Sequence, residues 1–248
     1  MIDLHSHVLP GVDDGARTLA ESVEIASAAV AEGVELLAAT PHVRGDYPTS
    51  AGEMERLVAS TQAALREAGI ELELRTGGEI ALDFLPRLGP DELRRFGLAG
   101  NPRYLLLEFP YAGWPLALEP LVGSLRDQGI TAVIAHPERN EEVQAAPGRL
   151  SDAVDLGALV QVTASSLTGG SGSRARKAGR TLLDRELVHL LAGDAHAAGV
   201  RRAGMKDAAD ALGDEPLARW LTHDVPRAIV DDEPLPERPP RRRRGLLG

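Results

Sequence analysis

Three stretches of the chain share one pattern of apolar and polar positions. In each, a glycine follows a helix-like segment, an apolar run rich in β-branched residues comes next, and a His or Glu ends the run. The stretches are AEGVELLAATPH, EAGIELELRTGGE and DQGITAVIAHPE. Glycine in that place is typical of a helix that closes in the left-handed conformation. Strands that alternate with helices of about 10–15 residues predict βαβ units and a parallel sheet.

The helices that precede these glycines also carry start signals. Thr18 with Glu21, and Ser50 with Glu53, have the spacing of a capping box. In that motif the hydroxyl and the carboxylate accept hydrogen bonds from backbone amides that the first helical turn leaves free. We therefore expect helices to begin just after Thr18 and Ser50.

Four further runs bring the predicted strands to seven. They are the opening IDLH and the runs at 103–109, 158–164 and 186–196. These runs are largely apolar rather than alternating, as expected for strands covered on both faces. We predict an α/β fold in one domain over residues 1–233, a distorted (β/α) barrel of about seven mainly parallel strands. An open doubly wound sheet is the alternative.

The composition excludes several classes of protein. The chain has no cysteine, which excludes disulfides, zinc fingers and catalysis through a cysteinyl-phosphate. A net charge of −10, with only two Trp, three Tyr and three Phe, argues against a nucleic-acid partner. No apolar run approaches the length of about 18 residues that a membrane span needs. No basic-then-apolar leader precedes the first strand, so we expect a cytoplasmic protein.

The last residues differ from the rest of the chain. Residues 238–248 carry five arginines and no acidic residue. Proline and arginine at this density predict a flexible tail over residues 234–248 that does not pack. The tail either docks on an anionic membrane or acidic partner, or is only solvated.

Residues that bind metals stand at or just beyond the carboxyl ends of six of the seven predicted strands. In a barrel these ends converge on one face, so residues far apart in the chain would meet in one pocket. A ninth candidate, Asp14 in GVDDG, also fits a turn-forming role. The nine candidates are His5, His7, Asp14, His42, Glu79, Glu108, His136, Asp194 and His196.

The spacing of these residues supports a shared pocket. Side chains two apart on a strand point the same way, so His5 and His7 face together. Asp194 and His196 repeat that spacing on the last predicted strand. Glu108 follows the apolar run YLLL, where a carboxylate is costly unless it is paired or metal-bound. Taken singly, the histidines also fit core or capping roles.

The combined set of five histidines and four carboxylates favours manganese, with Fe or Zn as alternatives. Nine ligands are too many for one ion, so we expect two or three ions at about 3.5–4 Å separation, as in multinuclear hydrolytic sites. Three divalent ions against four carboxylates leave a positive surplus that a phosphate dianion would neutralise. Arg139, in AHPERN, and Arg201 would grip phosphate oxygens with their planar guanidinium groups. A surface ion pair is the alternative role for each.

These motifs resemble a known family. The stretches DLHSHVLPGVDDGART, ATPH, GGEI, LLLEFP, IAHPERN and GDAH are similar to those of the PHP-type protein-tyrosine phosphatases of bacterial capsule and exopolysaccharide clusters, from residue 1 to about residue 201. Two positions depart from the pattern. Many relatives have a histidine where this chain has Val43, and an asparagine where it has Ala197. Neither position belongs to the ligand set.

The resemblance implies a trinuclear, manganese-preferring site. It assigns the first ion to His5, His7 and Asp194. It assigns the second to Glu108 and His136, with Glu79 bridging to the first. It assigns the third to Asp14, His42 and His196. It also implies that Arg139 and Arg201 bind phosphate, and that the partner is a bacterial tyrosine kinase that controls polysaccharide assembly.

We therefore expect metal-dependent hydrolysis of phosphotyrosine in proteins. A histidinol-phosphate phosphatase, or another small-molecule phosphoesterase of the same family, is the alternative. A nuclease of this family is disfavoured by the acidity and the few aromatic residues. A non-catalytic metal-binding module that regulates polysaccharide synthesis is the alternative from another class, and the complete ligand set argues against it. Tyr111 and Trp114, in FPYAGWP, either contact an incoming peptide or pack within their loop.

Overall fold

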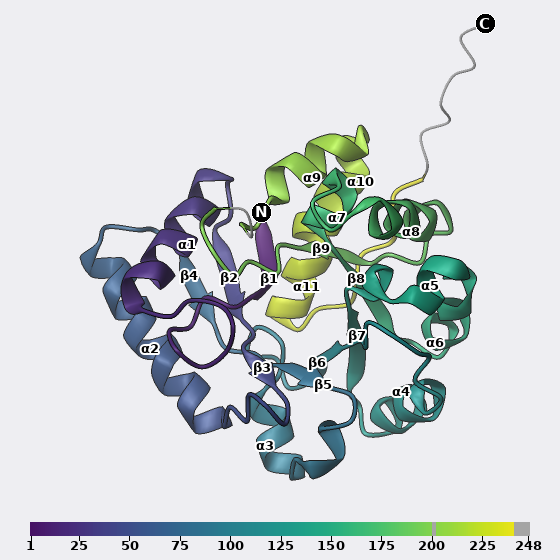
Figure 1. Cartoon of the computed structure of the whole chain (residues 1–248), viewed down its shortest axis with the longest axis horizontal. Helices are drawn as coiled ribbons and strands as arrows, with labels where there is room; N and C mark the ends of the chain where they lie inside the picture. Colours follow the sequence, from purple (N-terminus) through teal and green to yellow (C-terminus); the bar gives the residue numbers. More distant parts are fainter. Residues whose placement is uncertain (200–201, 241–248) are drawn as a thin grey trace, which may run out of the picture.

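The fold is a ring of strands enclosed by helices (Figure 1). The computed structural model describes residues 1–199 and 202–240. Within these residues the strands are β1 (Ile2–Ser6), β2 (Leu36–Ala39), β3 (His42–Val43), β4 (Glu73–Arg75), β5 (Glu79–Ala81), β6 (Tyr104–Glu108), β7 (Thr131–Ala135), β8 (Leu159–Thr163) and β9 (Leu190–Ala192).

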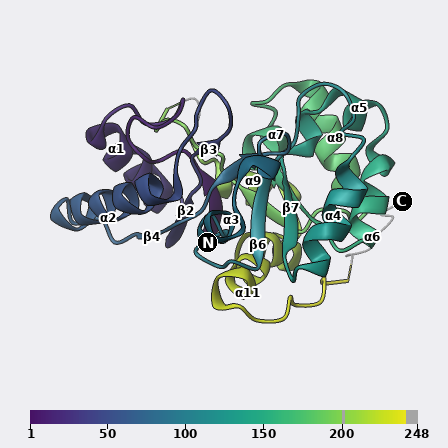
Figure 2. The ribbon, with the colours of Figure 1, turned by 90° about the horizontal axis from the view of Figure 1, so that it is seen from below.

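Helices cover the outside of the ring. In the described part of the chain they are α1 (Leu19–Ala31), α2 (Ala51–Glu67), α3 (Pro90–Arg95), α4 (Leu118–Asp127), α5 (Glu141–Ala145), α6 (Ser151–Asp155), α7 (Ala164–Thr168), α8 (Ser173–Asp184), α9 (Met205–Leu212), α10 (Glu215–Arg219) and α11 (Val225–Asp231). Seen from below, α1 and α2 lie beside β2 and β4, and α4, α5, α6 and α8 lie on the opposite side (Figure 2). Within residues 1–199 and 202–240, no helix combines the length and the apolar character that a bilayer span requires.

Both predicted helix starts are confirmed. The Thr18 side chain accepts a hydrogen bond from the Glu21 amide at 3.2 Å, and the Ser50 side chain accepts one from the Glu53 amide at 3.3 Å. The Glu21 carboxylate accepts from the Arg17 amide at 2.8 Å, one residue before the position that a full capping box uses. The three predicted helix-ending glycines have positive φ, from +69° to +87°.

The strands form two sheets, in the orders β4-β2-β1 and β3-β5-β6-β7-β8-β9. Every pair of neighbouring strands in the described part runs parallel. Two of the seven predicted strands are each divided into two segments. Thr40 and Pro41 separate β2 from β3, and residues 76–78 separate β4 from β5. Counting each divided strand once leaves seven positions around the ring, which confirms the prediction of a distorted, mainly parallel barrel.

The ring closes through a short contact instead of a full strand pair. The Asp194 amide donates to the His5 carbonyl at 2.8 Å, and the His7 amide donates to the Ala195 carbonyl at 2.9 Å. The last predicted strand, 186–196, is therefore shorter than expected and spans only Leu190–Ala192. Glu186 and Asp194 have φ values of +62° and +51°, and this left-handed backbone interrupts extended pairing on either side of β9.

The strands are buried along their length. Every residue of β1, β2, β6, β8 and β9 is buried, which explains why these runs are apolar rather than alternating. A few residues of these strands are polar although they are fully buried, among them Asp3, His5 and Gln161. Because buried polar groups are costly unless they have partners, these residues show that part of the interior is polar and hydrogen-bonded.

His189, outside the predicted site, has a ring nitrogen that the fold uses as a hydrogen-bond acceptor. Its Nδ1 accepts a hydrogen bond from the Val160 amide at 3.1 Å. Burial, with Arg238 nearby, lowers the pKa of His189 to about 4. An unfolded histidine takes up its proton near pH 6.5, so this residue costs stability progressively as the pH falls from about 6.5 to about 4.

We expect the His189→Gln variant to lose less stability on acidification than the unchanged protein. At pH 5 the free energy of unfolding should have fallen by about 1–2 kcal/mol less in the variant than in the unchanged protein, as calculated from the two pKa values. Urea unfolding at about pH 7.5 and about pH 5 measures it. Equal losses in the two proteins would show that His189 is not held neutral by the fold.

Candidate metal centre

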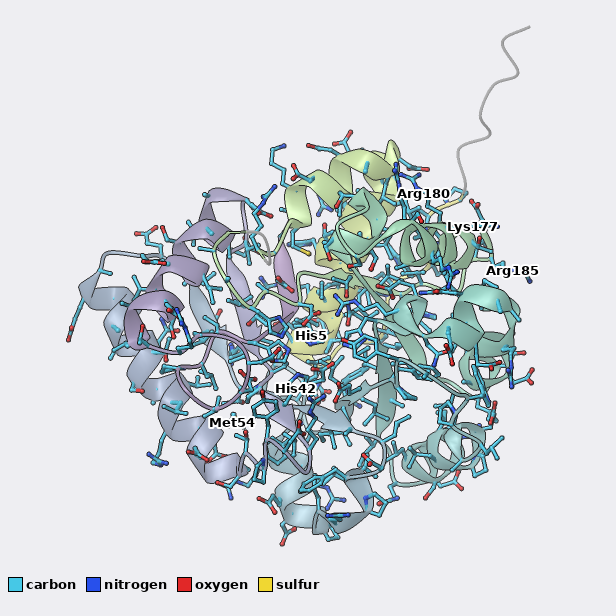
Figure 3. The ribbon with its side chains drawn as sticks, in the orientation of Figure 1. His5, His42, Met54, Lys177, Arg180 and Arg185 are labelled. Atoms are coloured by element: carbon cyan, nitrogen blue, oxygen red, sulfur yellow. The ribbon has the colours of Figure 1, made fainter. Side chains whose placement is uncertain are left out.

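The nine predicted ligands meet at the carboxyl ends of the strands. Figure 3 shows His5 and His42 near the middle of the ring. Within the described residues, the side chains form four overlapping groups in which the ligand atoms all lie within 4.8 Å of one another. The groups are His7, Asp14, His42 and His196; His5, Glu79 and His136; His5, His7 and Asp194; and His42, Glu79 and Glu108. Eight of the nine residues are buried, and Asp14 stands at the exposed edge.

Glu79 is the centre of this arrangement. It is fully buried, and its Oε2 lies 3.4 Å from His5 Nε2 and 3.3 Å from His7 Nε2. The same oxygen lies 3.0 Å from His42 Nδ1, while Oε1 lies 2.7 Å from His136 Nε2. Burial alone would raise the pKa of Glu79, but the neighbouring His5 and His136 hold it well below its usual range. The carboxylate is therefore ionised among four imidazoles.

Asp194 is the second buried anion of the site. Its Oδ1 lies 3.4 Å from His5 Nε2 and 3.2 Å from His7 Nε2. Its Oδ2 accepts from Arg139 Nη2 at 2.7 Å. Burial opposes ionisation of Asp194, yet the charges of His5, His7 and Arg139 keep its pKa well below the usual value. The site therefore holds two carboxylates ready to bind cations.

Hydrogen bonds behind the histidines orient their rings. His5 Nδ1 lies 3.0 Å from Gln161 Oε1, His7 Nδ1 lies 2.7 Å from Asp13 Oδ2, and His196 Nδ1 lies 2.9 Å from the Asp194 carbonyl. Since each partner is an acceptor, one proton is held on Nδ1, and Nε2 is the nitrogen that faces the site and can bind a cation once it is unprotonated. This outer bonding is what fixes the tautomer of histidines that bind metals.

Several buried atoms of the site have no hydrogen-bond partner within the described residues. They include His136 Nδ1, and also His42 Nδ1 and Glu79 Oε2, which lie 3.0 Å apart but are not aligned for a hydrogen bond. A buried polar atom without a partner is costly, and a cation between converging nitrogen and oxygen donors would remove that cost. The residues present therefore fit divalent metal ions bound by mixed imidazole and carboxylate ligands.

Backbone conformations at the site are unusual. His136 and Asp194 have φ values of +34° and +51°, a left-handed region that residues other than glycine rarely adopt. Gly15 ends the turn that carries Asp14, and a Cβ there would lie 2.1 Å from the His7 carbonyl oxygen. Only glycine lets that turn approach His7. Strained positions of this kind collect at functional sites, where the surrounding packing holds them.

The structure groups the candidates somewhat differently from the resemblance. The sets His5, His7 and Asp194, and Asp14, His42 and His196, each lie together. Glu108, which the resemblance pairs with His136, groups instead with His42 and Glu79. Glu79 therefore lies close to both Glu108 and His136.

Of the two arginines predicted to bind phosphate, the structure describes only Arg139. Arg139 reaches the site and binds Asp194, with a side chain that is 17% exposed. Arg201 lies outside the described residues. Tyr111 is 55% exposed, and its ring stacks on His136 at 6.1 Å between centroids. Trp114 packs edge-on against Phe109 at 5.7 Å, so it belongs to the loop packing.

Sequence reasoning missed several residues that support the ligands. Asp13 and Gln161 orient histidines, and Arg44 Nη1 donates to Glu108 Oε1 at 2.9 Å. Gln161 had a readable signal, because it is the only polar residue between the apolar positions of LVQV. Arg44 had none, since its partner lies 64 residues away in the chain.

Comparison with known proteins decides the family. A family model described as "Capsular polysaccharide synthesis, CpsB/CapC" matches residues 1–229. The chain belongs to the CpsB/CapC family. This confirms the resemblance drawn from the motifs.

Relatives of the CpsB/CapC family are similar over nearly the whole chain. The tyrosine-protein phosphatase YwqE of Bacillus subtilis is 33% identical over 255 residues, covering 100% of this chain and 99% of YwqE. The tyrosine-protein phosphatase CpsB of Streptococcus pneumoniae is 28% identical over 244 residues, covering 94% of this chain and 99% of CpsB. A structure from the crystallographic work on YwqE and CpsB, described as unique metal-dependent tyrosine phosphatases, matches with a TM-score of 0.87 and 30% identity. The match covers 98% of this chain and 100% of that one.

Proposed function

We propose that this chain is a metal-dependent protein-tyrosine phosphatase that hydrolyses phosphotyrosine in proteins. The observation that carries the proposal is the convergence of nine imidazole and carboxylate side chains, Glu79 among them, with Arg139 at their edge. Membership of the CpsB/CapC family, whose relatives YwqE and CpsB are named tyrosine-protein phosphatases, supports it.

The nine residues would hold two or three divalent ions. Manganese is the ion we propose, with Fe or Zn as alternatives, because imidazole nitrogen and carboxylate oxygen are mixed and no thiolate is present. When bound, such ions make hydroxide available from water near neutral pH and neutralise charge on the phosphoryl group. The chain therefore requires no nucleophile of its own.

Arg139 is placed to hold the phosphoryl group. Asp194 binds one end of the Arg139 guanidinium. The Nε of Arg139 is buried and has no hydrogen-bond partner among the described residues. Despite burial, the charges of Asp194 and Glu138 raise the pKa of Arg139, so it stays protonated. A phosphate oxygen would satisfy the free Nε–H, and the planar group would stabilise the charge that develops as the P–O bond breaks. We propose the same phosphate-binding role for Arg201.

The tyrosyl side of the substrate would lie in the adjoining cavity. This cavity of about 600 Å³ is lined by Glu108 at the end of β6 and by residues of the loops beyond β3, β5 and β6, among them Arg44, Leu82 and Tyr111. The exposed Tyr111 ring offers a flat surface for an incoming phenyl ring. Tyrosinate, with a pKa of about 10, is a better leaving group than an alkoxide. The site therefore favours an aryl phosphate.

The protein substrate we propose is a bacterial tyrosine kinase with a clustered tyrosine tail that controls polysaccharide assembly. The family description, capsular polysaccharide synthesis, supports this choice. Such a substrate would place the enzyme in the cytoplasm.

A panel of substrates tests the function. We expect manganese-loaded protein to hydrolyse a phosphotyrosine peptide with kcat/KM at least about 10²-fold above that for a phosphoserine peptide or histidinol phosphate, because the leaving group differs by several pKa units. Release of inorganic phosphate measures each rate. Faster turnover of histidinol phosphate would assign the site to small-molecule chemistry. Metal-loaded protein that cleaves no phosphoester would support a regulatory module.

Asn140 connects the arginine to the loop that carries Tyr111. Its Nδ2 donates to the carbonyls of Pro110 at 2.7 Å and Gly113 at 2.8 Å, and its Oδ1 caps α5. We expect Asn140→Ser, which keeps a capping oxygen and removes both donations to the loop, to raise KM for a phosphotyrosine peptide about tenfold, the equivalent of roughly one to two hydrogen bonds. Turnover of the small substrate p-nitrophenyl phosphate should change far less. An equal loss on both substrates would mean that Asn140 acts only on the general fold.

A further inference from the structure

One face of α8 is strongly basic. Arg174, Arg176, Lys177 and Arg180 are exposed along the helix, and Arg185 is exposed directly after it. We call these five residues the basic face of α8. In Figure 3 the labelled members, Lys177, Arg180 and Arg185, lie at the outer margin of the molecule, far from His5 and His42. The opposite face of α8 is buried through alanine, glycine and leucine, so the helix is held in place by packing.

The positive charges of the basic face are only partly offset, because residues 174–185 hold one carboxylate, the exposed Asp184, against five cations. Within the described residues, no carboxylate forms a salt bridge with any of its five side chains. Elsewhere some exposed arginines, such as Arg56 and Arg66 of α2, also form no salt bridge among the described residues, but others have partners. Arg17 binds Glu21, and Arg95 binds Glu55 at 2.6 Å. The protein as a whole has a net charge of −10, so this face stands apart from an acidic background.

This arrangement works against the helix itself. Arg174 and Arg176 lie in the first turn, which contains no acidic residue, although the helix dipole favours anions there. Arg176 and Arg180 are spaced i, i+4, and Lys177 lies three residues from both Arg174 and Arg180. Like charges at these spacings destabilise a helix. An external anionic surface would relieve that repulsion.

The end of the described chain adds positive charge nearby. Arg238 Nη1 donates to the carbonyls of Glu186 at 3.3 Å and Val188 at 2.7 Å, just beyond Arg185. Trp220 Nε1 donates to the Pro236 carbonyl at 3.0 Å, which also fixes this segment. The chain therefore reaches residue 240 close to the end of α8, and the sequence continues with four arginines at 241–244. Residues 241–248 lie outside the described residues. Of the tail predicted over 234–248, residues 234–240 are described, and Pro236 and Arg238 make the contacts given above.

We propose that the basic face of α8 docks on the anionic surface of a phospholipid bilayer. Clusters of four to eight basic residues are what such a surface attracts, and binding falls as salt screens the charges. A planar partner touches one face only, so the acidic remainder of the protein stays away from it. A nucleic acid would extend over that acidic surface and would find few aromatic rings to stack on. The proposal is independent of the proposed hydrolysis.

Vesicle sedimentation with the full-length protein tests the proposal. We expect binding to phosphatidylcholine vesicles that contain about 30 mol% phosphatidylglycerol and little binding to phosphatidylcholine alone. Raising salt from about 50 mM to about 300 mM should release the protein. The triple variant Arg176→Gln, Lys177→Gln, Arg180→Gln should bind about tenfold or more weakly, because three charges leave the contact. Binding to both lipids alike would overturn the proposal.

A matched variant controls for net charge. Arg56, Arg66 and Arg94 are exposed on α2 and α3, and replacing all three by glutamine makes the same change in net charge. This control should keep vesicle binding, and both triple variants should keep p-nitrophenyl phosphate hydrolysis and the melting temperature. Equal losses in the two triples would contradict a specific face. Loss of all binding on changing only Arg241–Arg244 to glutamine would assign binding to the tail. Retention on heparin or polyglutamate, without vesicle binding, would assign the face to a different polyanion.

Discussion

Replacing Glu79 by glutamine will lower the turnover of a phosphotyrosine peptide by about 10³-fold, the upper range for removing one electrostatic group from an active site. The reason is its position. The carboxylate is fully buried and lies within 3.4 Å of a nitrogen of His5, His7, His42 and His136. Glutamine has nearly the same shape but no charge, so the ions proposed to lie beside it lose a shared anionic ligand. The bound metal content should fall as well.

Activity, metal content and folding should be measured on the same Glu79→Gln preparation. Mass spectrometry of the metals and steady-state kinetics give the first two, and urea unfolding shows whether the fold remains. Glu67→Gln, at an exposed position at the end of α2, is the matched control and should behave as the unchanged protein. A Glu79→Gln protein with normal metal content and normal turnover would remove Glu79 from the metal centre.

Removing the metal ions will abolish hydrolysis, and adding manganese back will restore it. Without bound ions the site holds imidazoles and carboxylates, some of whose buried atoms lack a hydrogen-bond partner within the described residues, and the chain has no cysteine that could act as the nucleophile. We expect the rate of hydrolysis to fall by at least about 10³-fold after chelation and dialysis, because bound metal ions supply a large part of the rate enhancement in such reactions. Parallel additions of Mn, Fe, Zn and Mg identify the preferred ion. Full activity in protein shown to be free of metal would contradict the proposed mechanism.

Metal binding should also depend on pH in a defined direction. In the metal-free protein, burial opposes protonation, but Asp14 and Glu79 raise the pKa of His42 to about 9. His7, bonded to Asp13, Asp194 and Glu79, likewise has a pKa well above the usual value despite its burial. A ligand must lose its proton to bind a cation, so metal affinity should rise with pH and binding should release protons. Calorimetry in buffers of different ionisation enthalpy measures that release.

Local chemistry accounts for most of what was predicted about the fold. The start of α1 after Thr18 and of α2 after Ser50 follows from a side-chain oxygen and an amide three residues apart. The parallel ring follows from apolar runs buried on both faces and separated by helices. Placing ligands at the carboxyl ends of strands then predicts that they converge. Each of these steps uses residues that are close together in the sequence, or a general rule of parallel folds.

Other features depended on contacts that no local pattern reveals. The short span of β9 accompanies the closure of the ring, where Ser6 pairs with Ala195 through a single bridge. The grouping of Glu108 with His42, beside Arg44, joins residues whose separation in the chain leaves no periodic signal. The assignment of particular ligands to particular ions stays a prediction for metal analysis.

The sequence by itself determined the type of fold, the kinds of ligand and the family, because helix caps, apolar runs and short motifs act over a few residues. Only the tertiary structure decided that Glu79 stands at the centre, that Asp194 holds Arg139, and that four cations of α8 are exposed together with Arg185 after it. These depend on distances between side chains from separate elements. Such distances are set by packing of the whole ring, which no single stretch of the chain encodes.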